Sequence, residues 1–120
     1  MDVTGLTADI VAFFVSCYHL AEHISADVAV PQPARTGARP YVRSELSLQL
    51  AADITNTYKH SQRHAGERTC SITDLSIRPS GAVVTFTWID AQGNSHHEDG
   101  LNLAEQAVIA WSTFLQGHGL

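Results

Sequence analysis

Residues 83–115, VVTFTWIDAQGNSHHEDGLNLAEQAVIAWSTFL, change their hydrophobic period part-way along, and this change decides the fold class. Val84, Phe86 and Trp88 alternate with Val83 and two threonines, which is the pattern of a half-buried strand. After the turn sequence AQGN, a short strand is expected around SHHED. Apolar residues then recur at helical spacing, namely Leu103, Ala107, Val108, Trp111, Phe114 and Leu115. A strand pattern followed by a helix pattern predicts an α+β fold.

The sheet is expected to be a small antiparallel meander over about residues 69–99. Its first strand is predicted in SITDLSIRP, where apolar and polar residues partly alternate. Pro79, Ser80 and Gly81 follow as a hairpin turn into the strand described above. A meander of this size is not stable alone, so helices are expected to pack against one of its faces.

Helical periodicity predicts two helices before the meander. The first is expected over about residues 7–25, where these apolar residues recur every three or four positions: Ile10, Phe13, Phe14, Cys17, Leu20, Ala21 and Ile24. The second is expected over about residues 44–64, because Ser44 is a good capping residue and Gly66 a good stop. These two helices are predicted to form an antiparallel hairpin.

The remaining segments complete one domain over residues 1–120. The stretch ADVAVPQPARTGARP contains three prolines and little periodicity, so residues 26–43 are expected to be an extended linker. Asn102 and Glu105 resemble a capping box, which predicts the last helix over about residues 103–116. The predicted architecture is a helical hairpin and a C-terminal helix packed with the β-meander.

Composition narrows the class of protein. The N-terminus lacks the basic start and long apolar run of a signal peptide, and no apolar run is long enough to cross a membrane, so a cytoplasmic location without membrane contact is expected. Cys17 and Cys70 fit reduced thiols better than a disulfide framework. The net charge of -5 opposes non-specific binding to nucleic acid. However, residues 35–68 have a net charge of +3, which allows a locally positive surface.

The first predicted helix contains the order H-x-x-E-H, formed by His19, Glu22 and His23, which is found in some zinc proteases. His19 and His23 lie one helical turn apart and can both reach one metal ion, with Glu22 as a base for bound water. A zinc hydrolase also needs a third ligand and a substrate cleft, which usually demand a longer chain. A solvated helix face is the preferred interpretation, so no cofactor is expected and the metal site stays a weak alternative.

The second predicted helix carries a more promising polar row. Asp53, Asn56 and His60 follow one another at steps of three and four residues, and Lys59 lies beside His60. The row offers an acceptor, an amide, an imidazole and a cation on about two turns of helix. Such a set can bind a phosphate or polarise a hydroxyl group, although one wet face is also ordinary for a helix in a small domain.

Three stretches resemble a group of uncharacterised bacterial and phage proteins: FFVSCYHLAEHI, LQLAADITNTYKH and the segment 83–115 quoted above. That group is distantly similar to HEPN domains, small helical bundles that often dimerise and include metal-independent RNases, toxins of toxin–antitoxin pairs and binding-only relatives. The resemblance implies a HEPN-like bundle with a β-hairpin insertion. It assigns the group's motif positions to Tyr18, His19, Asp53, Asn56, Lys59 and His60.

Three hypotheses follow for function, of which a binding or regulatory module for a nucleotide, an RNA segment or a protein partner is the leading one. The second is a metal-independent RNase, with His60 as general acid or base, Lys59 as the cation and Arg63 as added charge. HEPN nucleases carry an R-x4-6-H motif, however, and the chain has no arginine before a histidine at that spacing. The third is a protein-interaction module. In this hypothesis Val11 and Val15 of the first helix contact either a second copy, which gives a homodimer, or another protein.

Overall fold

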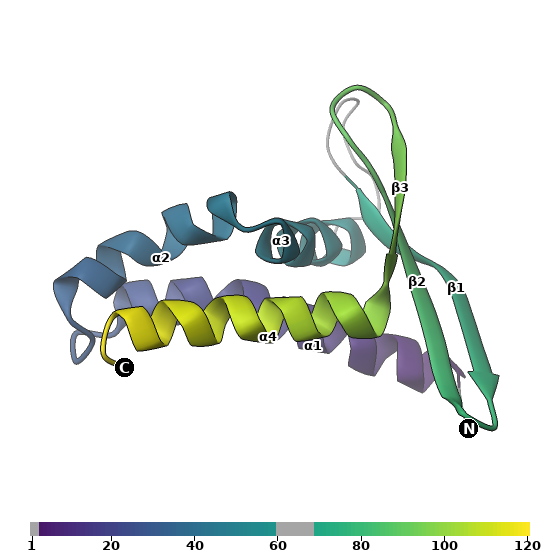
Figure 1. Ribbon diagram of the computed structural model, residues 1–120, viewed down its shortest axis with the longest axis horizontal. Helices are drawn as coiled ribbons and strands as arrows, with labels where there is room; N and C mark the ends of the chain where they lie inside the picture. Colours follow the sequence, from purple (N-terminus) through teal and green to yellow (C-terminus); the bar gives the residue numbers. More distant parts are fainter. Residues whose placement is uncertain (1–2, 60–68) are drawn as a thin grey trace.

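The computed structural model describes residues 3–59 and 69–120 (Figure 1). Four helices and three strands lie in this part of the chain, which confirms the predicted α+β class. In chain order they are α1 (Val3–Ala26), α2 (Gln32–Ser44), α3 (Leu46–Lys59), β1 (Cys70–Arg78), β2 (Gly81–Ile89), β3 (Ser95–Asp99) and α4 (Gly100–Gly117).

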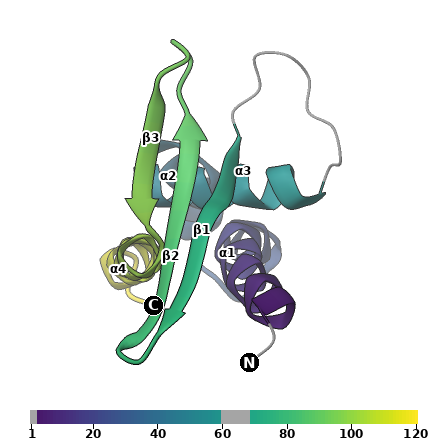
Figure 2. The same cartoon turned by 90° about the vertical axis from the view of Figure 1, so that its right-hand side faces the viewer.

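The three strands form the predicted antiparallel meander in the order β1-β2-β3. Phe86 on the central strand lies opposite Ile72 on β1, and Trp88 lies opposite His96 on β3. The pairing of β1 with β2 shifts by one residue between Ile72 and Asp74, as in a β-bulge. Figure 2 shows that the helices lie on one side of the sheet, so its two faces have different environments.

The core lies where α1, α3 and α4 meet the inner face of the sheet. Phe14 of α1 and Phe86 of β2 are both buried, and their rings meet edge to face with centroids 5.2 Å apart. Trp111 of α4 donates its indole N–H to the backbone carbonyl of Cys17, with a distance of 2.9 Å. These contacts join segments far apart in the sequence and orient α1 against α4.

The prediction of an extended linker over residues 26–43 was wrong, because α2 occupies most of it. The three prolines are compatible with this helix for different reasons. Pro31 precedes the first helical residue and Pro33 lies in the first turn, where backbone N–H groups have no partner within a helix. Pro40 lies inside α2 and removes one hydrogen bond there. Burial of Ala34, Ala38 and Val42 along one side of the helix offsets that loss.

Helix boundaries also differ from those predicted. The first helix begins at Val3 rather than near residue 7, and α3 begins at Leu46 rather than Ser44. The predicted cap of the last helix was wrong as well, because α4 begins at Gly100 and its cap is Asp99. The carboxylate of Asp99 accepts a hydrogen bond from the Asn102 backbone N–H at 3.0 Å.

The apolar residues on which the homodimer prediction rested are only partly exposed. Val11 and Val15 are half-buried, and Val11 packs against the core. The exposed apolar side chains near them are instead Phe13 of α1 and Val108 and Ile109 of α4. The homodimer therefore stays a prediction. In the part of the chain that the structure describes, no helix has the length and apolar character needed to cross a membrane.

Candidate functional site

A groove of about 770 Å³ lies among α1, α2 and α3. Each helix contributes polar side chains to its walls. The residues that carry chemistry are Tyr18, His19 and Glu22 of α1, Arg39 and Arg43 of α2, and Gln49, Asp53, Asn56 and Lys59 of α3. The groove is therefore built from three segments, of which two were predicted to be helical.

The amphipathic pattern of α3 explains how it lines the groove. Leu50 and Ile54 are fully buried on one side of the helix, so Asp53 and Asn56 are directed to the adjoining side. Thr55 is also buried, and its hydroxyl donates to the Ala51 carbonyl one turn earlier, at 2.9 Å. Since the apolar side is fixed by the core, the polar row has one orientation.

The C-terminal end of α3 is attached to the sheet. The Cys70 backbone N–H donates to the Thr57 hydroxyl at 3.1 Å, and the Ile72 N–H donates to the Tyr58 hydroxyl at 2.9 Å. Both donors belong to β1. These bonds hold the last turn of α3, which carries Lys59, against the first strand.

Arg39 and Arg43 lie one turn apart on α2 and line the groove. Elsewhere on the same helix, Tyr41 donates its hydroxyl to the Ala110 carbonyl of α4 at 2.6 Å. The Gln49 side-chain amide donates to the Arg43 carbonyl and joins the end of α2 to the start of α3. The two guanidinium groups are thus carried by a helix that is anchored on α4 and α3.

The groove combines three cations with two carboxylates. Glu22 accepts a hydrogen bond from His19 Nδ1 at 3.1 Å, and one carboxylate oxygen of Asp53 is buried. No ion pair joins Arg39, Arg43 or Lys59 to an acidic side chain among residues 3–59 and 69–120. The three cations and the carboxylates of Glu22 and Asp53 therefore line one groove.

Five of the predicted site residues come together in this groove: Tyr18, His19, Asp53, Asn56 and Lys59. His60 and Arg63 lie outside the described residues. His23 is exposed and does not line the groove, although His19 does. Over residues 3–59 and 69–120, the structure contains no group of three His, Cys, Asp or Glu side chains that could hold a metal ion.

Sequence reasoning missed Arg39 and Arg43, because both lie in the segment that was predicted to be a linker. The sequence does contain a helical periodicity that places these two arginines on a helix. Ala34, Ala38 and Val42 recur every four residues, and the two arginines keep the same spacing one position later. Proline content outweighed this weak periodicity in the prediction.

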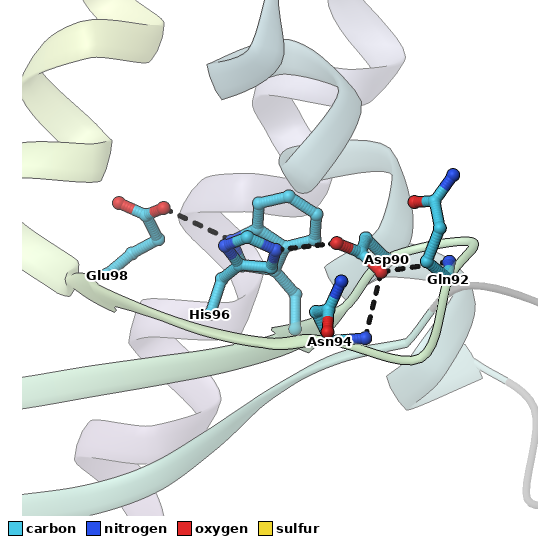
Figure 3. Close-up of polar contacts among 6 residues, drawn as sticks. Asp90, Gln92, Asn94, His96 and Glu98 are labelled. Carbon is cyan, nitrogen blue, oxygen red and sulfur yellow. Dashed lines mark hydrogen bonds and ion pairs between the residues drawn. The ribbon is translucent and has the colours of Figure 1, made fainter.

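A second polar cluster, drawn in Figure 3, lies on the β2–β3 hairpin. None of its residues lines the groove. His96 stacks on Trp88 with ring centroids 4.1 Å apart, and His96 Nε2 donates to Asp90 at 2.8 Å. The Trp88 indole donates to Glu98 at 3.1 Å. The bond from His96 lowers the pKa of Asp90 to about 2, with help from the N–H groups of the turn. The polar groups of this cluster are hydrogen-bonded to one another, which indicates a structural role in the hairpin.

His96 and His97 point to opposite faces of the sheet, as expected for neighbours in a strand. His97 Nδ1 is 2.8 Å from the Thr87 hydroxyl, which in turn is 2.7 Å from the Thr73 hydroxyl. The two histidines therefore belong to separate clusters and cannot chelate one ion together.

No protein-family model, curated protein or solved structure matches the chain. The side chains of the groove themselves indicate what kind of ligand it can bind. Guanidinium and ammonium groups bind anions, while the Asn56 amide and the Tyr18 ring and hydroxyl suit a polar or aromatic group.

Proposed function

We propose that the protein is a binding module for a phosphate-bearing ligand, either a free nucleotide or a segment of RNA, held in the groove among α1, α2 and α3. One observation carries the proposal. Arg39, Arg43 and Lys59 line the same groove as Asn56 and Tyr18, and no described acidic side chain pairs with these cations.

Each group has a role that its chemistry supports. Arginine presents a planar fork of donors that matches two phosphate oxygens, and lysine adds a compact charge. Asn56 can donate to and accept from the edge of a base, and the Tyr18 ring can stack on its face. Asp53, an acceptor within the groove, favours the donor groups of a ligand over a bare anion.

We also propose, as an alternative, that the protein is HEPN-like and acts as a metal-independent RNase. The position of Lys59 in the groove supports this alternative, because an RNase needs a cation beside the reacting phosphate. His60 would supply the acid or base, and it lies outside the described residues. Incubating the protein with RNA in EDTA separates the alternatives, because cleavage that is lost in His60→Ala supports catalysis and intact RNA supports binding alone.

The protein–interaction alternative is supported by a different surface. Phe13, Ala104, Val108 and Ile109 surround an apolar hollow of about 380 Å³ between α1 and α4. Phe13, Val108 and Ile109 are each more than a third exposed. A surface of this kind suits contact with protein better than contact with phosphate.

A binding experiment tests the leading proposal. Titration with ADP and with a short RNA should show saturable binding to the wild-type protein. The variant Arg39→Gln/Arg43→Gln should bind roughly 10-fold to 100-fold more weakly, because a hydrogen bond to a charged group contributes about 1.5–3 kcal/mol. Wild-type protein that binds neither ligand, or a double variant that binds as well as wild type, would contradict the proposal.

Arg78→Gln is a matched control for this experiment. Arg78 is exposed at the end of β1 and does not line the groove. The Arg78→Gln substitution changes the net charge by one unit and leaves the residues of the groove unchanged. We expect the affinity of this variant for ADP and for the short RNA to stay within about 2-fold of wild type at physiological salt, since exposed distant charges are screened.

A further inference from the structure

Two of the three cations that line the groove come from α2, and the third is the last residue of α3. Gln49, whose side chain is bonded to the Arg43 carbonyl, marks the arginine end. Lys59 lies ten residues further along α3, which corresponds to about 15 Å along the helix axis. Arg39 lies one turn before Arg43 on α2, and both line the groove, so we assign them to one end of it.

The groove between these two ends has a different character. Asp53 and Asn56 lie between Gln49 and Lys59 on α3, and Tyr18 faces the same groove from α1. None of these three side chains is a cation. The order along α3 is therefore the arginine end, then a carboxylate and an amide, then Lys59, and Tyr18 lines the same groove from α1.

We propose that the groove binds a single-stranded oligonucleotide lengthwise, with phosphates at both cationic ends and a base between them; this rests on the proposed function. Successive phosphates of a stacked strand rise ~3.4 Å, so about 15 Å spans roughly four nucleotides. A free nucleotide carries its phosphates at one end and can occupy only one of the cationic places. A duplex keeps its bases paired, so none can lie against Tyr18 and Asn56.

Binding of a length series tests this inference. The probes are a mononucleotide and single strands of two, three, four, six and eight nucleotides, in RNA and in DNA. Affinity should rise at least about 10-fold from the mononucleotide to roughly four nucleotides and then level off. The RNA and DNA series distinguish the two sugar types, and a rise and plateau in either one supports the inference.

Lys59→Gln separates the two ends of the groove. Lys59 is exposed, so the variant should fold, which circular dichroism and thermal melting verify. It should weaken binding of the four-nucleotide strand about 10-fold, and the loss should be larger for this strand than for the mononucleotide, which reaches only one of the two cationic ends. The slope of log affinity against log salt for the strand should fall by about 0.7, the value for one phosphate contact on a single strand.

Failure of this inference differs from failure of the proposed function. If the mononucleotide binds as tightly as the longer strands, or if Lys59→Gln weakens both equally, the lengthwise mode is wrong while the phosphate-binding module stands. If affinity keeps rising to eight nucleotides without a plateau, the bound segment is not confined to this groove and the inference is also wrong. If no probe of any length binds, both proposals fall.

Discussion

Single residues at the turn between β2 and β3 show how one carboxylate can organise a hairpin. Asp90 accepts hydrogen bonds from the backbone N–H groups of Gln92 and Asn94, each at 2.9 Å, and from the His96 ring at 2.8 Å. The ring that it holds stacks on Trp88, which packs against the core. Asp90 thereby connects the tip of the hairpin to the folded body.

Ionisation of Asp90 should make stability depend on pH in an acidic window. Its pKa is lowered to about 2, below the ordinary value of about 3.9 in an unfolded chain. A lowered pKa stabilises the fold above the unfolded value, and this contribution is lost as the pH falls from about 4 to about 2. Urea denaturation of wild type and Asp90→Asn across that window should show a smaller loss of stability in the variant.

Asp74→Asn is the control for that measurement. Asp74 is exposed on β1 and makes none of the turn contacts of Asp90. We expect its loss of stability on acidification to match that of wild type. Equal pH dependence of Asp90→Asn and wild type would show that the carboxylate does not stabilise the hairpin through its charge.

At the scale of whole elements, α2 and α4 depend on contacts that their own sequences do not specify. Helix α2 contains an internal proline and Gly37, yet it packs through Ala34, Ala38 and Val42. Helix α4 begins immediately after β3, so its first residue lies close to the sheet. Glycine at position 100 allows this approach, because a side chain there would meet Val84.

Replacement of two helical glycines by alanine should therefore have opposite effects. A Cβ atom at Gly100 would lie 2.9 Å from Val84 Cβ and 3.2 Å from the Val84 carbonyl oxygen, so β2 or α4 must shift. We expect Gly100→Ala to lower the free energy of unfolding by about 1–3 kcal/mol. Chemical denaturation measures this change.

Gly37→Ala supplies the comparison. A Cβ atom there would lie 3.7 Å from the Phe114 ring, which is an ordinary contact. Alanine also favours a helix interior over glycine by about 0.5–1 kcal/mol, so this variant should be slightly more stable than wild type. A stabilised Gly100→Ala variant would mean that α4 does not lie as close to β2 as described.

At the scale of the molecule, the four helices and the three-stranded sheet of residues 3–59 and 69–120 share one core, and both cysteines lie within it. Cys17 of α1 and Cys70 of β1 are buried and are not joined by a disulfide. Burial also raises the pKa of the Cys17 thiol, so little of it is the reactive thiolate. The predicted reduced thiols agree with this arrangement.

Reaction with a thiol reagent should report on the whole fold. In the native protein at neutral pH both cysteines should react at least about 10-fold more slowly than free cysteine, because each must first be exposed by unfolding. In concentrated guanidinium chloride both should react at once, without a reducing agent. Rapid modification of the native protein, identified by mass spectrometry of peptides, would contradict the buried positions.

Much of the fold could be predicted because hydrophobic period is a local property. The alternation around Phe86 and the helical stripe around Trp111 are each readable within one segment, and both were confirmed. The same period in α3 predicted the row that contains Asp53 and Asn56, with Lys59 at its edge, while His60 of that row lies outside the described residues. Boundaries were less accurate, since the cap at Asp99 depends on where β3 ends.

The sequence by itself determined that strands of alternating period and helices of 3.6-residue period combine in an α+β fold, and that one helix carries a polar row. Only the tertiary structure decided that α2 is a helix and that its arginines share a groove with that row and with Tyr18. The physical reason is that α2 has weak helix signals of its own. Burial of Ala34, Ala38 and Val42 stabilises it, and burial depends on the rest of the chain.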